Sequence, residues 1–73
     1  MPTIETIRRV VRDFQAEELT WSEDDEGLIL DAGTAHRMLQ VYEAIRPDNQ
    51  VKFEKYLESK AGFVWLAGKV WEM

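Results

Sequence analysis

The acidic residues that could do chemistry are concentrated in one stretch of the chain. Seven of the fourteen Asp and Glu residues fall within fifteen consecutive positions that contain no Lys or Arg; they are Glu17, Glu18, Glu23, Asp24, Asp25, Glu26 and Asp31. A block of like charge repels itself and is kept where solvent, a counter-charge or a partner absorbs its field. The stretch therefore predicts a solvated turn, a surface that matches a basic patch on a partner, or a metal loop.

The spacing of these acids argues against the metal loop. A calcium loop needs oxygen ligands at alternating positions, a central Gly and a bidentate Glu at its last position. Here Asp24, Asp25 and Glu26 are consecutive, Gly27 follows at once, and no suitably placed Glu comes later. We expect no metal and no cofactor, and we keep Asp24, Asp25 and Glu26 as candidate partner-binding residues.

A catalytic centre is equally hard to assemble from this sequence. His36 is the only histidine, and a general base needs an oriented neighbour and a nucleophile, which no nearby Ser, Thr or Asp supplies. Gly33 and Thr34 stand before a predicted helix in the manner of an anion-binding helix start, but the glycine spacing and following Lys of a phosphate loop are missing. We therefore expect a protein that is not an enzyme.

Trp65 is the strongest candidate for a binding residue. At about 100° per residue, the last predicted helix places Trp65 almost opposite Phe63 and Val70 and near Lys69. An exposed Trp beside charged residues is typical of an interface anchor, because it offers a large rigid surface and loses little side-chain entropy on docking. The alternative is that the hairpin or the first helix covers the ring. We take Trp65 and Lys69 as candidate partner-binding residues.

Arg8, Arg9 and Arg12 form a short basic face on the first predicted helix. Such a face can bind phosphate, an acidic partner or this chain's own acidic stretch. A charged, solvated face without a partner is the plain alternative. We include the three arginines among the candidate partner-binding residues.

Four helices and one hairpin are expected to position these residues. Ile4, Ile7, Val11 and Phe14 repeat at helical spacing, and Leu19 and Trp21 alternate opposite Leu28 and Leu30. Thr34 and Asp48 are expected to cap the second and third helices, and Gly62 to end the third. The predicted elements are a helix from Thr3 to about Glu18, strands over 19–22 and 27–31, and helices over 34–45, 49–61 and 63–72.

Size and composition bound the fold class. The 73 residues suffice for a single domain, 1–73, and 45% apolar with 32% charged residues are globular values. We predict a mainly α fold, a compact bundle of four short helices with a small β-hairpin or acidic loop between the first two. Because such a short chain has a thin core, a second copy could stabilise it. The sequence leaves the oligomeric state undecided, and a dimer is one possibility.

The composition also limits location and partners. The chain has no cysteine, no apolar run long enough to cross a bilayer and no targeting segment at its start, so we expect a cytoplasmic protein away from membranes. The net charge of −5 disfavours direct binding to nucleic acid.

Two other interpretations of the sequence stay open. The predicted helices over 34–45 and 49–61 are joined by a short break and could form a helix-turn-helix, with Asn49, Gln50, Lys52 and Lys55 as groove readers. Glu54 lies on the same helix, where its negative charge would repel the DNA phosphates. Alternatively, the acidic stretch could mimic nucleic acid and occupy the basic cleft of a defence complex.

Part of the chain resembles short accessory proteins encoded by bacteriophages. The resemblance is to their C-terminal part, and it is carried by the runs 30–35 and 38–45, then Asn49 with 52–54. It implies a host-takeover factor that binds and redirects a bacterial machine such as RNA polymerase, and so a part in transcription regulation. No site residue is carried over from it. Our first hypothesis is a small protein-binding regulator or inhibitor that docks by an aromatic anchor and complementary charge.

Overall fold

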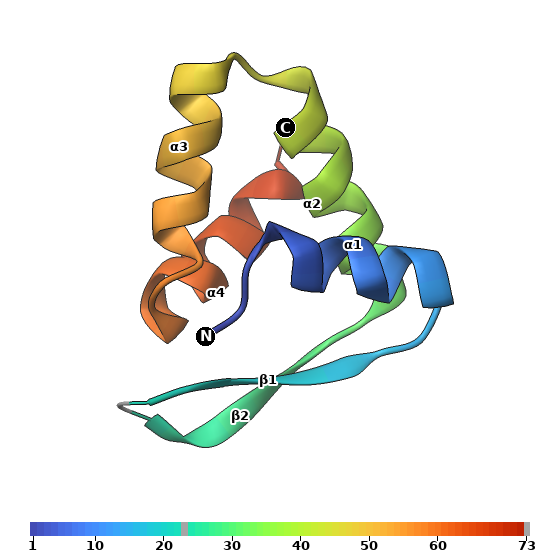
Figure 1. Cartoon of the computed structure of the whole chain (residues 1–73), viewed down its shortest axis with the longest axis vertical. Coiled ribbons are helices and arrows are strands. Elements are labelled where there is room, and N and C mark those ends of the chain that lie inside the picture. The colour runs from blue at the N-terminus through green and yellow to red at the C-terminus, as the bar shows by residue number, and fades with distance from the viewer. Residues whose placement is uncertain (23, 73) are drawn as a thin grey trace.

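Six elements follow one another along the chain, separated by short breaks. The computed structural model describes residues 1–22 and 24–72, without the side chains of Asp24 and Asp25. The elements are α1 (Ile4–Asp13), β1 (Glu17–Trp21), β2 (Asp24–Leu30), α2 (Ala32–Ala44), α3 (Pro47–Tyr56) and α4 (Lys60–Val70). In Figure 1, α1 lies across α2, the hairpin runs along one end of the helices, and α4 leads from the foot of α3 toward α2.

Helix α1 ends earlier than its apolar pattern predicts. Phe14 adopts a left-handed backbone conformation, with φ 53° and ψ 42°, and its N–H donates to the carbonyl oxygens of Val10 and Val11. The N–H of Gln15 also returns to Val10, at 3.3 Å, which closes the helix end. The chain therefore leaves the helix at Asp13 and not near Glu18. The expected inward position of Phe14 is wrong, because this turn leaves its side chain 85% exposed.

Within the described part of the acidic stretch, residues 17–21 and 24–30 form the two strands of a β-hairpin. Strands β1 and β2 pair antiparallel, with Leu19 opposite Leu28 and Glu17 opposite Leu30, and the register is irregular between Leu19 and Trp21. Leu19, Trp21 and Leu30 are buried, as alternation predicts. Their apolar face lets two strands persist, because it packs on the helices.

The N-cap of helix α2 lies three residues before the predicted cap. The side chain of Asp31 accepts a hydrogen bond from the N–H of Thr34 at 2.7 Å, so Asp31 and not Thr34 is the N-cap. This bond also lowers the pKa of Asp31, since it favours the ionised carboxyl. Gly33 and Thr34 consequently lie inside the first turn of α2 and do not precede it.

The break between α3 and α4 also differs from the prediction. Pro47 occupies the first turn of α3, and the helix ends at Tyr56 rather than continuing to Ala61. Ser59 then caps α4 by accepting from the N–H of Gly62 at 3.0 Å. Gly62 is thus in the first turn of α4 and is not the stop of α3. A Cβ at Gly62 would lie 2.5 Å from the carbonyl oxygen of Tyr56, so the turn requires glycine there.

One apolar core joins all six elements. Its buried members are Ile7, Val10, Leu19, Trp21, Leu30, Ala35, Met38, Tyr42, Phe53, Leu57, Phe63, Leu66 and Val70. Among the hydrogen bonds that link different helices, Arg37 Nε donates to the Val70 carbonyl at 2.8 Å, and Gln50 Nε2 to the Tyr42 carbonyl at 2.9 Å.

The mainly α fold with a hairpin is therefore confirmed. A bundle arrangement is not, since α1 lies across α2 in Figure 1. Helical spacing predicts that Tyr56 faces inward with Phe53, and Trp71 with Phe63. Both predictions are wrong, because the Tyr56 and Trp71 rings are exposed. Among the described residues, no helix has the length and apolar character needed to cross a membrane.

Candidate functional site

Two aromatic side chains form an exposed stack between α3 and α4. The rings of Tyr56 and Trp65 lie 4.8 Å apart between centroids, with an interplanar angle of 25°. Tyr56 is 41% exposed and Trp65 is 48% exposed, so each ring keeps a solvent-facing part. The exposure of Trp65 confirms the helical rotation. Neither the hairpin nor α1 covers Trp65, and Tyr56 supports it instead.

An apolar groove lies beside this stack. It has a volume of about 280 Å³ and is lined by Val41, Ile45, Asn49, Lys52, Phe53, Tyr56, Trp65 and Leu66; we call it the aromatic groove. Helices α2, α3 and α4 each contribute a wall. Two further hollows adjoin it, because they share lining residues with it: one shares Lys52 and Tyr56, the other Val41 and Ile45. We refer to these three hollows, which share lining residues, together as the depression on this face.

The rim of the depression is cationic. Lys52 and Lys55 line the hollow at α3, and Arg37 lines the hollow at α2. Lys69 Nζ lies 5.6 Å from the centroid of the Trp65 ring, within reach of a cation–π interaction, and it also pairs with Glu72 at 3.3 Å. Among the residues that the structure describes, no carboxylate lines any of the three hollows. The charged residues that line the three hollows are therefore all basic, although the chain carries a net charge of −5.

Helix α3 separates its charges by face. Lys52, Lys55 and Tyr56 are spaced three and four residues apart and share one side. Glu54 lies away from them and accepts a hydrogen bond from the Tyr42 hydroxyl at 3.1 Å. The glutamate that would oppose phosphates in a helix-turn-helix therefore does not line this hollow.

The three candidate arginines lie on α1 and each contacts a carboxylate of this chain. Arg8 pairs with Glu43 at 3.3 Å and with Glu5 at 3.5 Å. Arg12 pairs with Asp13 at 3.0 Å. Arg9 binds Glu17 on β1, which is one contact of the kind expected between the basic face and the acidic stretch.

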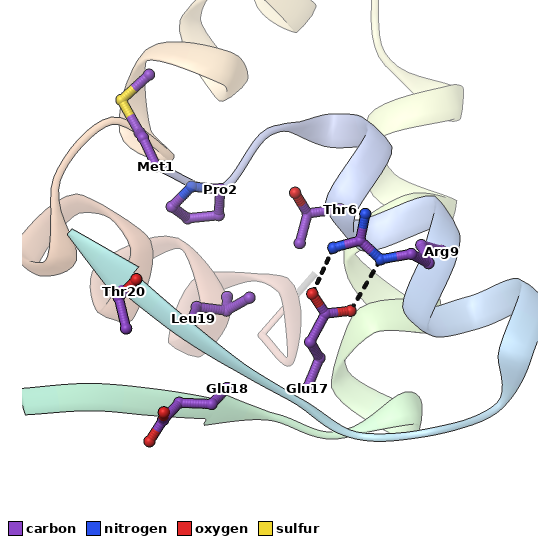
Figure 2. Close-up of a pocket in the computed structure, with 8 residues that line it drawn as sticks. All are labelled: Met1, Pro2, Thr6, Arg9, Glu17, Glu18, Leu19 and Thr20. Atoms are coloured by element: carbon purple, nitrogen blue, oxygen red, sulfur yellow. Dashed lines mark hydrogen bonds and ion pairs between the residues drawn. The ribbon is translucent and has the colours of Figure 1, made fainter.

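The Arg9 pair occupies a small polar hollow at the start of the chain. Figure 2 shows two bonds between the guanidinium and the Glu17 carboxylate, one of them from Nε to Oε2 at 3.0 Å. The hollow has a volume of about 150 Å³, and Met1, Pro2 and Thr6 are among its walls. The bonds from Arg9 lower the pKa of Glu17, because they favour its ionised form. The guanidinium of Arg9 in this hollow is therefore already engaged by a carboxylate of the chain.

The remaining candidates do not gather into a centre. The side chains of Asp24 and Asp25 lie outside the described part of the structure. Glu26 is exposed on β2, and its carbonyl oxygen accepts from Lys60 Nζ at 3.1 Å. His36 is exposed on α2. Among the side chains that the structure describes, which exclude those of Asp24 and Asp25, no group of three or more His, Asp or Glu could hold a metal ion.

The structure thus brings together Trp65 and Lys69 of the predicted set and adds residues that sequence reasoning did not group with them. Tyr56, Val41 and Ile45 complete the aromatic groove. The spacing of Lys52, Lys55 and Tyr56 along one helix face was a visible signal for part of it. No pattern in the sequence indicated that α2 would pack against α4.

The class of protein can be stated from these observations as a small, mainly helical protein with one antiparallel hairpin and a cationic, aromatic surface groove. No protein-family model matches the chain, and neither the curated proteins nor the solved structures contain a match.

Proposed function

We propose that this chain is a small non-enzymatic regulator or inhibitor that binds a larger protein through the aromatic groove. The stacked pair of Tyr56 and Trp65 is the observation that carries the proposal. Rings already held against each other lose little freedom on docking, and half-exposed Trp and Tyr are common energetic anchors of interfaces. The proposed partner is a bacterial machine such as RNA polymerase, which is what the bacteriophage resemblance implies.

Charge around the groove supports the same use. Lys52 and Lys69 flank the rings, so an approaching partner meets positive charge first and apolar surface second. Electrostatic complementarity speeds and orients encounter, while desolvated apolar contact slows dissociation. The groove therefore combines the two parts of the docking hypothesis on one face.

Affinity capture from the native host cell tests this function. The wild-type chain and a Trp65→Ala variant are used as baits, and the co-eluting proteins are identified and titrated. We expect Trp65→Ala to weaken capture of the specific partner by about tenfold or more, as truncation of an interface anchor does. Circular dichroism of each bait checks that the helices are retained.

Trp71→Ala is the matched control for this experiment. Trp71 is also exposed, at 61%, but it lines none of the three hollows among the described residues. We expect it to capture the partner as the wild-type chain does. Equal capture by the wild-type chain and Trp65→Ala rejects the proposal.

Nucleic-acid binding by α3 is the second candidate function. Lys52 and Lys55 beside the Tyr56 ring resemble a surface on which a single strand could stack a base and place a phosphate. A titration with single- and double-stranded oligonucleotides at two salt concentrations distinguishes this function, since phosphate contacts demand a steep loss of affinity with salt. Weak binding whose affinity does not change with salt concentration rejects nucleic-acid binding.

A further inference from the structure

We propose that the occupant of the aromatic groove is an amphipathic helix of the partner whose flanking polar residues are acidic. This inference rests on the proposed docking function and names the chemistry of the segment that binds. It follows from three observations on the groove: its charge, its backbone and its division into adjoining hollows.

The charge selects an acidic partner segment. Lys52 and Lys55 stand at the rim, and no carboxylate in the described part of the chain lies within ion-pair distance of either. Two adjacent cations without counter-charges repel each other, and an incoming Asp or Glu relieves that repulsion. A basic or neutral segment gains no such relief there.

The backbone of the walls selects a helix. The groove is built from α2, α3 and α4, whose interior N–H and C=O groups are bonded within each helix. It therefore presents no strand edge to which an extended peptide could add. An extended segment would find no strand to pair with here, whereas a helix satisfies its own backbone groups while it presents apolar side chains to the groove.

The adjoining hollows fit the spacing of a helix stripe. The central hollow, at about 280 Å³, shares Val41 and Ile45 with one neighbour and Lys52 and Tyr56 with the other. Apolar side chains at three- and four-residue intervals on one helix face can enter hollows that follow one another in this way. Trp65, on the wall of the central hollow, would contact the middle of that stripe.

Selection from a displayed library of helical peptides with randomised surface positions tests the inference without knowledge of the natural partner. The wild-type chain is the bait, and binders that also bind Trp65→Ala are discarded. We expect the retained peptides to share an apolar stripe and an excess of Asp and Glu beside it. Retained peptides that are basic or uncharged, or no retained peptides at all, overturn the inference.

The contribution of charge is measured by titrating the best peptide and a twin, a variant of the same peptide in which Lys replaces each acidic residue. We expect the acidic peptide to bind at least about tenfold more tightly than its twin at low salt, and the difference to shrink as salt screens the charges. Lys52→Glu with Lys55→Glu should weaken the acidic peptide by a similar factor. Equal affinity of the two peptides overturns the inference.

Arg12→Glu is the control for charge reversal. Arg12 is exposed on α1 and paired with Asp13, and it lines none of the hollows. At about 0.15 M salt, its reversal should leave peptide affinity within about twofold of wild type, because exposed charges more than about 8 Å apart are then largely screened. An equal loss from Arg12→Glu would show that overall charge and not the groove selects the peptide, and would overturn the inference.

Other occupants give separate results. Sedimentation that shows a concentration-dependent dimer, lost in the Lys52→Glu and Lys55→Glu double variant, replaces the acidic helix with a second copy of this chain. Host-cell capture that depends on Trp65, together with a partner segment that is not acidic, overturns the inference while the docking function stands. Capture independent of Trp65 rejects the docking function itself.

Discussion

The indole Nε1 of Trp21 donates a hydrogen bond to the carbonyl oxygen of Leu57 at 2.9 Å. Trp21 lies on β1, and Leu57 is the residue that follows α3, so one buried bond links the hairpin to the turn before α4. The Trp21 ring also meets Phe63 edge-on, with centroids 5.6 Å apart. The hairpin therefore contacts and stabilises the turn between α3 and α4, the two helices that carry Tyr56 and Trp65.

Trp21→Phe is expected to lower the free energy of unfolding by about 1–3 kcal/mol, because it leaves the buried Leu57 carbonyl without its donor while keeping an aromatic ring. Urea unfolding followed by circular dichroism measures the change. Trp71→Phe, at an exposed position, should stay within about 0.5 kcal/mol of wild type. Equal stability of both variants would show that the Leu57 carbonyl finds another donor.

Two glycines of α4 are expected to respond in opposite ways to the same change. Gly62→Ala should lower the free energy of unfolding by more than about 1 kcal/mol, because its Cβ would collide with the Tyr56 carbonyl oxygen. Gly68→Ala should raise it by about 0.5–1 kcal/mol, since nothing lies within 4 Å of that Cβ and Ala favours the helix. Thermal or urea unfolding of the pair measures both, and a stabilising Gly62→Ala contradicts this account of the α3–α4 turn.

Phe14→Gly is expected to leave the protein as stable as wild type or to stabilise it by up to about 1 kcal/mol. The left-handed conformation at φ 53° costs a residue with a Cβ more than it costs glycine, and the exposed ring has little packing to lose. Phe14→Val is the matched control and should destabilise, because a branched Cβ tolerates this conformation least. A loss of stability in the glycine variant would show that the Phe14 ring contributes to the fold.

Stability should depend on pH through Glu17. The hydrogen bonds from Arg9, followed by its charge, lower the pKa of this carboxyl below 4.5, so the pair stabilises the fold above that pH and the contribution is lost as pH falls through the folded-state pKa. We expect the urea midpoint of wild type to fall more steeply with acidification below about 4.5 than that of Glu17→Gln. Glu18→Gln, which removes the same charge without touching Arg9, should retain the wild-type slope. Parallel curves for wild type and Glu17→Gln contradict the prediction.

The existence of the helices and the inner face of the hairpin could be predicted from the sequence. Apolar residues at helical spacing and the alternation around Trp21 depend on neighbours a few positions away, and burial follows that pattern at Ile7, Leu19 and Leu30. The surface position of Trp65 followed from the same rotation argument.

Boundaries were predicted less well because they depend on which side chain reaches a free N–H group. Asp31 and Thr34 are both good caps by type, and backbone geometry chose Asp31. Likewise, a helical pattern continues through Phe14, but the chain turns there in a left-handed conformation and pairs as β1 from Glu17 onward.

The sequence by itself determined the chain's acidic balance, its helical periods and the placement of an aromatic ring on the outer face of the last helix. Only the tertiary structure decided that Val41, Tyr56 and Trp65 meet at one groove, and that Arg9 binds Glu17. The physical reason is the distance along the sequence over which each property is determined. Local periodicity tells which face of a helix is apolar, whereas the contact of residues on three different helices depends on how their whole surfaces pack together.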